Sequence, residues 1–387
     1  MRRSGILHGG RVVIIGGGVI GASIGFHLTA LGYPNVVILE RGHAGEGATA
    51  AATGGIRQQF SSEINARLVQ RSIELYKSFP DRTGAPFNYR EHGYLFLIAA
   101  GTDLLLFEKS VRMQNEMGIP SRLLEPSAVE SLMPGVNLDG LAGGAYCPTD
   151  GSGTPQEAVA GYAAAMRRQG GEIRLRTEAV GFSRTRSGDP RVLTPAGEVE
   201  AELVLIAAGP QSRDVGTLAG ITIPVTPHRR QAFATNPLPW LSDTLPFTVD
   251  LSTGAYIHPE IGGTAVIGGN DRSVPPGTDT RIDWQLAESL MQSLMERFPR
   301  MQDASISSGW AGLREMTPDD NAVVGPLGQP EGFWVAAGFS GHGFMQAPAI
   351  GEALAQLLIF GESNINLAPL RPGRFEEGPV SHEGVVF

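Results

Sequence analysis

The start of the chain follows a clear pattern, in which an apolar run ends at glycines and an apolar helix follows. Residues 12–15 (VVII) are all apolar, 16–18 (GGG) come next, and apolar side chains then recur every four positions through 19–31. This pattern predicts a strand, a tight turn and a helix that buries one face. A second apolar run at 36–39 ends at Glu40, which completes an expected strand–helix–strand unit.

The same periodicities predict further helices and strands along the chain. Helices are expected over 62–79 (with Ser62 as N-cap), 103–133, 158–169 and 283–298, and strands over 93–98, 172–176, 202–207 and at several places in 221–270. An apolar run at 333–337 then enters a second glycine-rich segment, and a helix is expected over 347–358. Alternation of strands and helices is typical of an α/β fold.

The order of these elements favours two domains that interleave along the chain. The first is an α/β, Rossmann-like domain built from 1–80, 151–215 and 312–387. The second is a mixed β-sheet domain for the substrate, inserted as 81–150 and 216–311. Because 387 residues exceed the usual size of one domain, a division of this kind is expected.

Composition and charge exclude several classes of protein. Hydrophobic residues at 42% and charged residues at 18% are typical of a globular core. A net charge of −9 argues against a nucleic-acid surface. No apolar stretch approaches the length of a membrane span, so none is expected. With Cys147 as the single cysteine, we expect no internal disulfide and no metal site, and a cytoplasmic location fits.

The glycine motif at the first turn predicts a dinucleotide site. Gly16, Gly18 and Gly21 form a GxGxxG between a predicted strand and a predicted helix, and Glu40 ends the second strand. The glycines let a pyrophosphate approach the helix N-terminus, and the acid can accept from ribose hydroxyls. The motif alone is weak, but its strand, helix and acid all fall in register. An acid at position 40 disfavours the 2′-phosphate of NADP.

Two further segments favour FAD over NAD as the dinucleotide. A small-residue loop over 45–55 offers backbone N–H groups along an extended cofactor. The strand at 202–207 closes on Ala208 and Gly209, which would bring backbone against the cofactor. Glycine-rich turns near both ends of the chain suit a long cofactor with two ends. A NAD-linked dehydrogenase stays open as an alternative.

The C-terminal glycine segment carries a family resemblance. Residues 338–344 (GFSGHGF) followed by 347–352 (APAIGE) resemble the flavin motif of the D-amino-acid oxidase superfamily of FAD-dependent amine oxidoreductases. Residues 55–60, 93–97 and 148–151 are similar to its proline-dehydrogenase β and sarcosine-oxidase β branch, which lies near glycine oxidase. With that resemblance, the candidate cofactor-binding residues are Gly16, Gly18, Val19, Ile20, Gly21, Glu40, Arg41, Ala48, Thr49, Thr53, Gly54, Gly55, Ile56, Ala179, Ala208, Gly209, Gly312, Gly338, Ser340, Gly341, His342, Gly343, Phe344 and Met345.

The resemblance also implies an activity and residues that handle the substrate. Members of this superfamily oxidise a C–N bond of a small amine or amino acid by hydride transfer to the flavin. Arg314 and Tyr256 match the pair that holds the substrate carboxylate in glycine oxidase, although a surface arginine and a core tyrosine are the plain alternatives. Arg57 resembles an arginine near the flavin ring, or anchors its loop. For His342 a positioning role and a structural one are equally open.

Departures from the family pattern affect how the cofactor is held and how it is reoxidised. The family's covalent flavin attachments use a cysteine near Gly312 or a histidine near Ala50, and neither is present, so we expect non-covalent FAD. Met345 replaces a lysine of monomeric sarcosine oxidase, and an apolar residue near Val266 replaces its oxygen-activating lysine. Oxygen or another electron acceptor is therefore expected. An alternative is an FAD-bearing subunit that needs partner chains for electron transfer.

Overall fold

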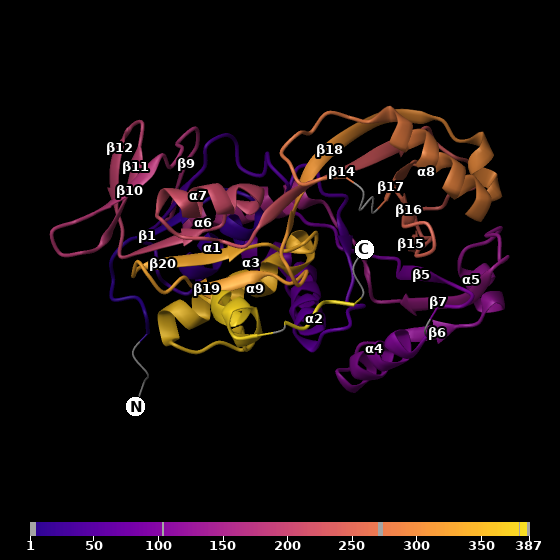
Figure 1. Ribbon diagram of the computed structural model, residues 1–387, viewed down its shortest axis with the longest axis horizontal. Helices are drawn as coiled ribbons and strands as arrows, with labels where there is room; N and C mark the ends of the chain where they lie inside the picture. The colour runs from indigo at the N-terminus through magenta and orange to yellow at the C-terminus, as the bar shows by residue number, and fades with distance from the viewer. Residues whose placement is uncertain (1–4, 103, 270–273, 379, 385–387) are drawn as a thin grey trace.

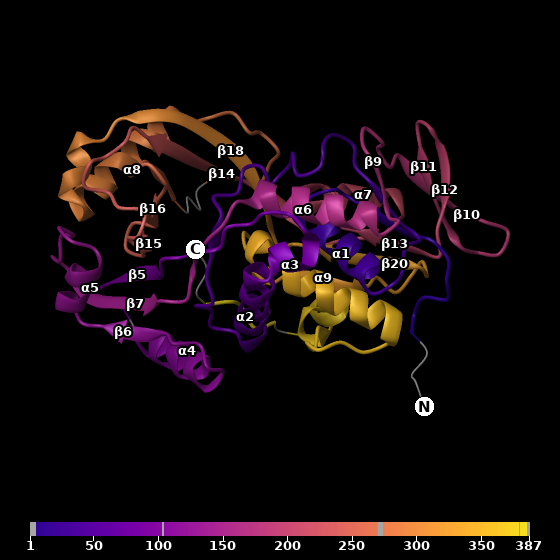
Figure 2. The same cartoon turned by 180° about the vertical axis from the view of Figure 1, so that it is seen from behind.

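The computed structural model describes residues 5–102, 104–269, 274–378 and 380–384 (Figure 1). The helices are α1 (Val19–Ala30), α2 (Glu63–Lys77), α3 (Phe79–Thr83), α4 (Leu105–Glu116), α5 (Pro126–Leu132), α6 (Pro155–Arg168), α7 (Ser212–Leu218), α8 (Trp284–Arg297) and α9 (Gly343–Phe360). The molecule is mixed α/β, with two large sheets placed side by side in Figures 1 and 2.

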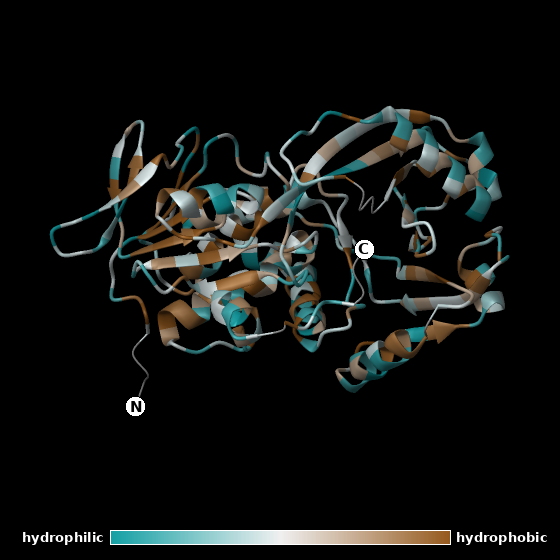
Figure 3. Ribbon diagram, in the orientation of Figure 1, coloured by the Kyte–Doolittle hydropathy of each residue, from teal (hydrophilic) through white to brown (hydrophobic). Residues whose placement is uncertain are grey.

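A six-stranded sheet forms the centre of one half of the molecule. Its strands, in spatial order, are β19 (Val323–Pro326), β20 (Phe333–Ala337), β13 (Leu203–Ile206), β1 (Val12–Ile15), β2 (Val36–Leu39) and β9 (Glu172–Arg174). All pairs are parallel except β19 with β20. The central strands are apolar along their whole length because both faces of a parallel sheet are covered (Figure 3).

Helices α1, α6 and α9 pack together on one face of this sheet. Small residues let them approach closely: a Cβ at Gly351 would lie 2.2 Å from Ser23 Oγ, and one at Gly25 would lie 2.7 Å from Met166 Sδ. Contrary to the expectation that no apolar stretch approaches the length of a membrane span, helix α9 is long and apolar enough to cross a membrane, but 72% of that stretch is buried inside the protein. Its composition is therefore explained by its place in the core.

The opposite face of the six-stranded sheet is covered by α7 and a small antiparallel sheet. That sheet consists of β10 (Gly181–Arg184), β11 (Pro190–Thr194) and β12 (Gly197–Glu200). A second small sheet links the two halves and consists of β3 (Gly55–Ile56), β8 (Gly151–Ser152) and β4 (Arg90–Glu91).

An eight-stranded mixed sheet forms the other half. Its strands, in spatial order, are β18 (Ile306–Met316), β14 (Thr226–Thr235), β17 (Ala265–Gly269), β16 (Ala255–Pro259), β15 (Phe247–Asp250), β5 (Tyr94–Ala99), β7 (Leu141–Cys147) and β6 (Arg122–Leu124). Helices α5 and α8 pack against one face with an apolar core of their own. Strand β18 runs through position 312, where the domain boundary is expected, and the division into domains stays a prediction.

Most predicted elements are present, and one long helix is wrong. Instead of a helix over 103–133 there are α4, the strand β6 and α5, and residue 103 lies outside the described residues. Gly118 (φ +83°) ends the first helix, and Pro120 and Pro126 disfavour helical backbone in the residues before them. Ser62 does precede α2, but its hydroxyl makes no cap bond to the helix.

The hydroxyl of Ser62 instead bonds a carboxylate from the far end of the chain. Glu383, which is buried, accepts from Ser61 N and Oγ through Oε1, and from Ser62 Oγ and Asn65 Nδ2 through Oε2. The start of α2 is thus fastened by the C-terminal segment rather than by its own cap. The loop that carries Arg57 ends at this same point.

Candidate active site

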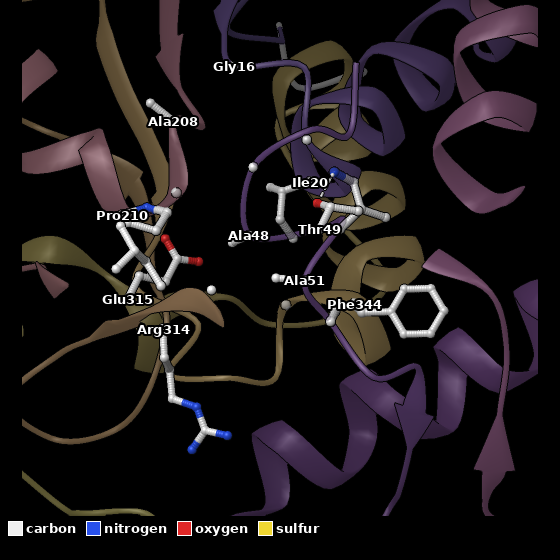
Figure 4. Close-up of a pocket in the computed structure, with 18 of the residues that line it drawn as sticks. Gly16, Ile20, Ala48, Thr49, Ala51, Ala208, Pro210, Arg314, Glu315 and Phe344 are labelled. Carbon is white, nitrogen blue, oxygen red and sulfur yellow. Dashed lines mark hydrogen bonds between the residues drawn. The ribbon is translucent and has the colours of Figure 1, made fainter. Parts of the chain in front are cut away.

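A cavity of about 970 Å³ lies between the two large sheets, and residues from both ends of the chain line it. Its size is at the upper limit of ordinary ligand pockets, as a dinucleotide requires. The predicted residues that line it are Gly16, Gly18, Val19, Ile20, Glu40, Arg41, Ala48, Thr49, Thr53, Gly54, Gly55, Arg57, Ala179, Ala208, Gly209, Tyr256, Gly312, Arg314, Gly341, His342, Gly343, Phe344 and Met345. Figure 4 shows Gly16 and Ile20 across the cavity from Ala208 and Pro210.

The nucleotide end of the cavity is built by the turn after β1. Gly16 has φ +110°, and a Cβ there would lie 2.3 Å from the carbonyl oxygen of Ala207, so only glycine fits. Glu40 is held in place by N–H groups, since Oε2 accepts from Gly17 N and Oε1 from Gly42 N, each at 2.7 Å. A carboxylate oxygen accepts more than one bond, so Glu40 can still accept from ribose hydroxyls.

The N-terminus of α1 opens on this end of the cavity. Thr49 Oγ1 accepts from Val19 N at 3.1 Å, which fixes the small-residue loop against the helix. A Cβ at Gly18 would lie 3.3 Å from the same hydroxyl oxygen, so the turn and the loop are in close approach. The N–H groups and the positive end of the helix dipole suit a pyrophosphate.

Four predicted cofactor residues lie behind the cavity wall instead of on it. A Cβ at Gly21 would lie 2.0 Å from the Gly16 carbonyl oxygen, so this glycine brings α1 against the turn. Ile56 is fully buried in the core beside α1 and α9. Gly338 (φ +72°) and Ser340 form the turn after β20, and Ser340 N donates to the carbonyl oxygen of Glu315. These residues shape the site from behind.

Tyr256 and Arg314 lie at the other end of the cavity, each beside a glycine that makes room for it. Tyr256 on β16 stands opposite Gly268, where a Cβ would lie 2.3 Å from the phenol oxygen. A Cβ at Gly341 (φ +94°) would lie 2.6 Å from Nε of Arg314. Two strands of the eight-stranded sheet and the C-terminal glycine turn therefore meet at one place.

Arg57 and His342 form a second buried pair at this end. Nη2 of Arg57 lies 3.3 Å from Nε2 of His342, and Nη1 donates to the carbonyl oxygen of Gln59. The guanidinium also lies over the Phe60 ring, 4.3 Å from its centre, and the imidazole packs edge-on against the same ring. Arg57 therefore both anchors its own loop and orients His342.

Burial sets the charge states of His342, Tyr256 and Arg314. It lowers the pKa of His342 well below its usual value, and the cations of Arg57 and Arg314 lower it further, so this imidazole is neutral. Burial raises the pKa of Tyr256 to about 12, which keeps the phenol protonated. Burial and the nearby Arg230 lower the pKa of Arg314 to about 10, so Arg314 is still a cation at neutral pH.

Several residues that line the cavity were missed in the sequence. They are Glu46, Ala51, Tyr94, Thr177, Glu178, Pro210, Gln211, Asp214, Arg230, Gln231, Phe247 and Glu315, among others. Tyr94 and Phe247 stack at 4.5 Å and form an aromatic wall beside Tyr256. Strand alternation could have revealed Arg230, because it stands opposite Gly312 and so shares a face with Arg314.

The residues present fit FAD. Glycine turns, a carboxylate at the nucleotide end and a helix N-terminus hold one half, and a cavity long enough for a second half leads to buried cations. Within the described ranges, no group of three or more His, Cys, Asp or Glu is placed to hold a metal ion.

The chain matches the model of one protein family over most of its length. The model of the family described as "FAD dependent oxidoreductase" (DAO) matches residues 11–357. The crystal structure of L-proline dehydrogenase from P. horikoshii superposes with a TM-score of 0.89 at 30% identity, covering 96% of this chain and 98% of that one. Glycine oxidase from Geobacillus kaustophilus superposes with a TM-score of 0.83 at 27% identity, covering 94% and 98%.

A third relative is longer than this chain. Mitochondrial dimethylglycine dehydrogenase of Mus musculus is 28% identical over 94% of this chain, which spans 44% of that protein's length.

Proposed function

The chain belongs to the DAO family of FAD-dependent oxidoreductases, and we propose that it oxidises the C–N bond of a small amino acid or N-alkyl amino acid. The product is an imine, which hydrolyses to a carbonyl compound and an amine or ammonia. The substrates named for L-proline dehydrogenase, glycine oxidase and dimethylglycine dehydrogenase are all of this kind, which supports the proposal.

One observation carries the choice of substrate class: a half-buried arginine and a buried tyrosine meet at the end of the cavity away from the nucleotide turn. Arg314 supplies a cation and Tyr256 a phenol hydroxyl, which together suit a carboxylate. A carboxylate held there fixes the adjacent carbon and its amine inside the cavity. Water is excluded on one side by the stacked rings of Tyr94 and Phe247.

FAD, when bound, supplies an acceptor for the hydride that leaves the carbon bearing the amine. The role of the protein is then to bind and orient. His342 is neutral and lies against Arg57, so it positions the substrate end of the site and gives up no proton at neutral pH. The substrate amine has to be neutral, because its lone pair helps to expel the hydride. The cations of Arg57 and Arg314 favour that neutral form.

We expect FAD to be held without a covalent bond. Gly312 occupies the place where some relatives of the family have a reactive cysteine, and a Cβ there would lie 2.3 Å from Cβ of Ala51. A larger side chain at this position would have to displace the small-residue loop. Release of the flavin into solution on acid precipitation of the protein would support non-covalent binding, and yellow precipitate would contradict it.

The substrate class is tested by anaerobic bleaching of the bound flavin. Glycine, sarcosine, dimethylglycine, proline and D-amino acids are each mixed with the purified holoprotein, and the fall in absorbance near 450 nm is followed. Methylamine and pyrrolidine, which lack the carboxylate, are the matched controls. We expect at least one amino acid to bleach the flavin and its decarboxylated control to fail. Equal bleaching by both members of a pair would contradict a carboxylate site.

A second candidate, an FAD-bearing subunit that needs partner chains, differs in its electron acceptor. The apolar residue near Val266, which stands in the place of the family's oxygen-activating lysine, favours slow reaction with oxygen. Turnover of the isolated chain with oxygen or a redox dye argues against obligate partners. Bleaching without turnover under either condition supports them.

A further inference from the structure

Glu315 is a half-buried residue on the cavity wall whose carboxyl group the proposed reaction does not use. It follows Arg314 at the end of β18 and lines the cavity. Figure 4 shows its carboxyl group pointing into the cavity from the same side as Pro210, between Gly16 at the nucleotide end and Arg314 at the substrate end.

The two oxygens of this carboxyl group have different surroundings. Oε1 accepts from Phe339 N at 3.3 Å, in the turn after β20, and the N–H of Gly338 also bonds the carboxyl group. Oε2 is buried and has no hydrogen-bond partner within the part of the chain that the structure describes. A buried carboxyl oxygen without a partner costs most when the group is ionised, which favours the protonated form. A ligand can then pair with the part of the carboxyl group that faces the cavity.

The position of Glu315 indicates which part of a bound dinucleotide its carboxyl group would contact. Its Oε2 would lie 3.6 Å from a Cβ at Gly209, at the end of β13, which is the strand beside β1. A ligand that extends from Gly16 to Arg314 has to pass this point. The pyrophosphate is unsuitable as a neighbour, since it would be repelled by a carboxylate, whereas the polyol chain of FAD offers hydroxyl groups.

We propose that the carboxyl group of Glu315 binds FAD through a hydrogen bond to a hydroxyl of its ribityl chain. Burial raises the pKa of Glu315 to about 7, so the group can donate as well as accept near neutral pH. Glu315 is thus a cofactor-binding residue that sets where the middle of the dinucleotide lies. Because it adjoins Arg314 on one strand, it links the position of the cofactor to the position of the substrate.

The test is the dissociation constant of FAD for the apoprotein, followed by quenching of flavin fluorescence. Glu315→Leu keeps the approximate volume and removes both oxygens, and we expect about tenfold weaker binding, the ordinary net effect of one hydrogen bond. Glu315→Gln can still accept from the N–H groups and donate to a hydroxyl, and we expect binding within about threefold of the wild type. Glu288→Gln on the exposed side of α8 is the matched control and should be unchanged.

FAD analogues that each lack one ribityl hydroxyl identify the partner. One analogue should bind the wild type about tenfold more weakly and show no further loss with Glu315→Leu, because the two changes remove the same bond. The proposal is overturned if Glu315→Leu binds FAD like the wild type, if Glu315→Gln loses as much as Glu315→Leu, or if the losses add for every analogue. Thermal unfolding of each apoprotein checks that the variants are folded.

The proposal rests on FAD binding and not on the substrate class. The titration contains no amine, so a failure to find a substrate leaves its result unaffected. Conversely, a Glu315→Leu variant with normal FAD affinity would leave the amino-acid proposal intact.

Discussion

The two ends of the cavity are built in opposite ways. At the nucleotide end the contacts come from backbone N–H groups, glycines and one carboxylate, and nearly all belong to the first part of the chain. At the substrate end they come from the large side chains Arg57, Tyr256, Arg314 and His342, which four separate segments bring together.

The two ends also differ in the free energy that it costs the folded protein to form them. The nucleotide end stores little energy, because its glycines adopt their conformations without strain and its N–H groups face a ligand. The substrate end holds one buried and one half-buried cation, Arg57 and Arg314, beside a neutral histidine, which costs desolvation energy that an anionic ligand offsets. In the proposed function, the first end would hold the dinucleotide through backbone groups, and the second would bind a charged group of the substrate.

The largest expected effect comes from removing a cation from the substrate end of the cavity, which carries Arg57 and Arg314 and is called the charged end below. Arg314→Ala should raise KM for a carboxylate substrate. The rise corresponds to a loss of about 2–4 kcal/mol of binding free energy, because a charge-assisted pair is removed. FAD affinity should change little. Steady-state kinetics and flavin titration measure the two effects, and the exposed Arg67→Ala on α2 is the control. An unchanged KM would remove Arg314 from the carboxylate site.

A substitution in the turn at the nucleotide end should weaken FAD binding and leave KM for the substrate unchanged. In Gly16→Ala the added Cβ meets the Ala207 carbonyl oxygen at 2.3 Å, and the positive φ adds strain, so FAD binding should weaken by about 2 kcal/mol or more. Gly9→Ala is a matched control, since Gly9 has a similar φ of +107° but open space around it. Equal loss in both variants would mean that strain alone matters.

The neutral histidine gives a pH signature specific to the charged end. Its pKa is lowered in the folded state, so below about pH 6.5 the unfolded chain binds more protons and stability falls as pH falls. His342→Asn removes this contribution. The gap in unfolding free energy between wild type and variant should therefore shrink on acidification, by at most about 1.4 kcal/mol per pH unit.

Chemical denaturation of the apoproteins between pH 7 and pH 5 measures this gap. His382→Asn, at an exposed position, is the control and should give a constant gap. A constant gap for His342→Asn as well would mean that its imidazole is not held neutral by the fold.

The smallest expected effect concerns the partner of Arg314. Tyr256→Phe keeps the ring packed against Phe247 and removes the hydroxyl. KM should rise by an amount that corresponds to about 0.5–1.5 kcal/mol of binding free energy, with kcat nearly unchanged. Gly268→Ala acts on the same hydroxyl from the other side, because a Cβ there would lie 2.3 Å from it. A substrate without a carboxylate should be insensitive to either change, and a KM that moves for both substrates would argue against a carboxylate contact.

The contrast between the ends also explains what could be predicted from the sequence. The turn at Gly16, the strand that ends at Glu40 and the strand β20 were predictable because each is a local pattern of apolar and small residues. The helix over 103–133 was wrong, because the strand β6 gains its stability by pairing with β7, which is distant in sequence.

At the charged end the sequence predicted which residues line the cavity better than it predicted how strand geometry places their neighbours. Arg314 and Tyr256 were expected from family resemblance, and the structure places both on the cavity. Their assigned roles stay predictions. Glu315 was missed because alternation along a strand puts it opposite Arg314, yet at the end of β18 the cavity is in contact with both.

The bonds of Glu383 to Ser61, Ser62 and Asn65 have a practical consequence for anyone who makes the protein. They join the last described segment to the start of α2, just after the loop that carries Arg57. Removal of Glu383 would therefore take away the bonds that hold the start of α2, although Glu383 is remote from α2 in sequence.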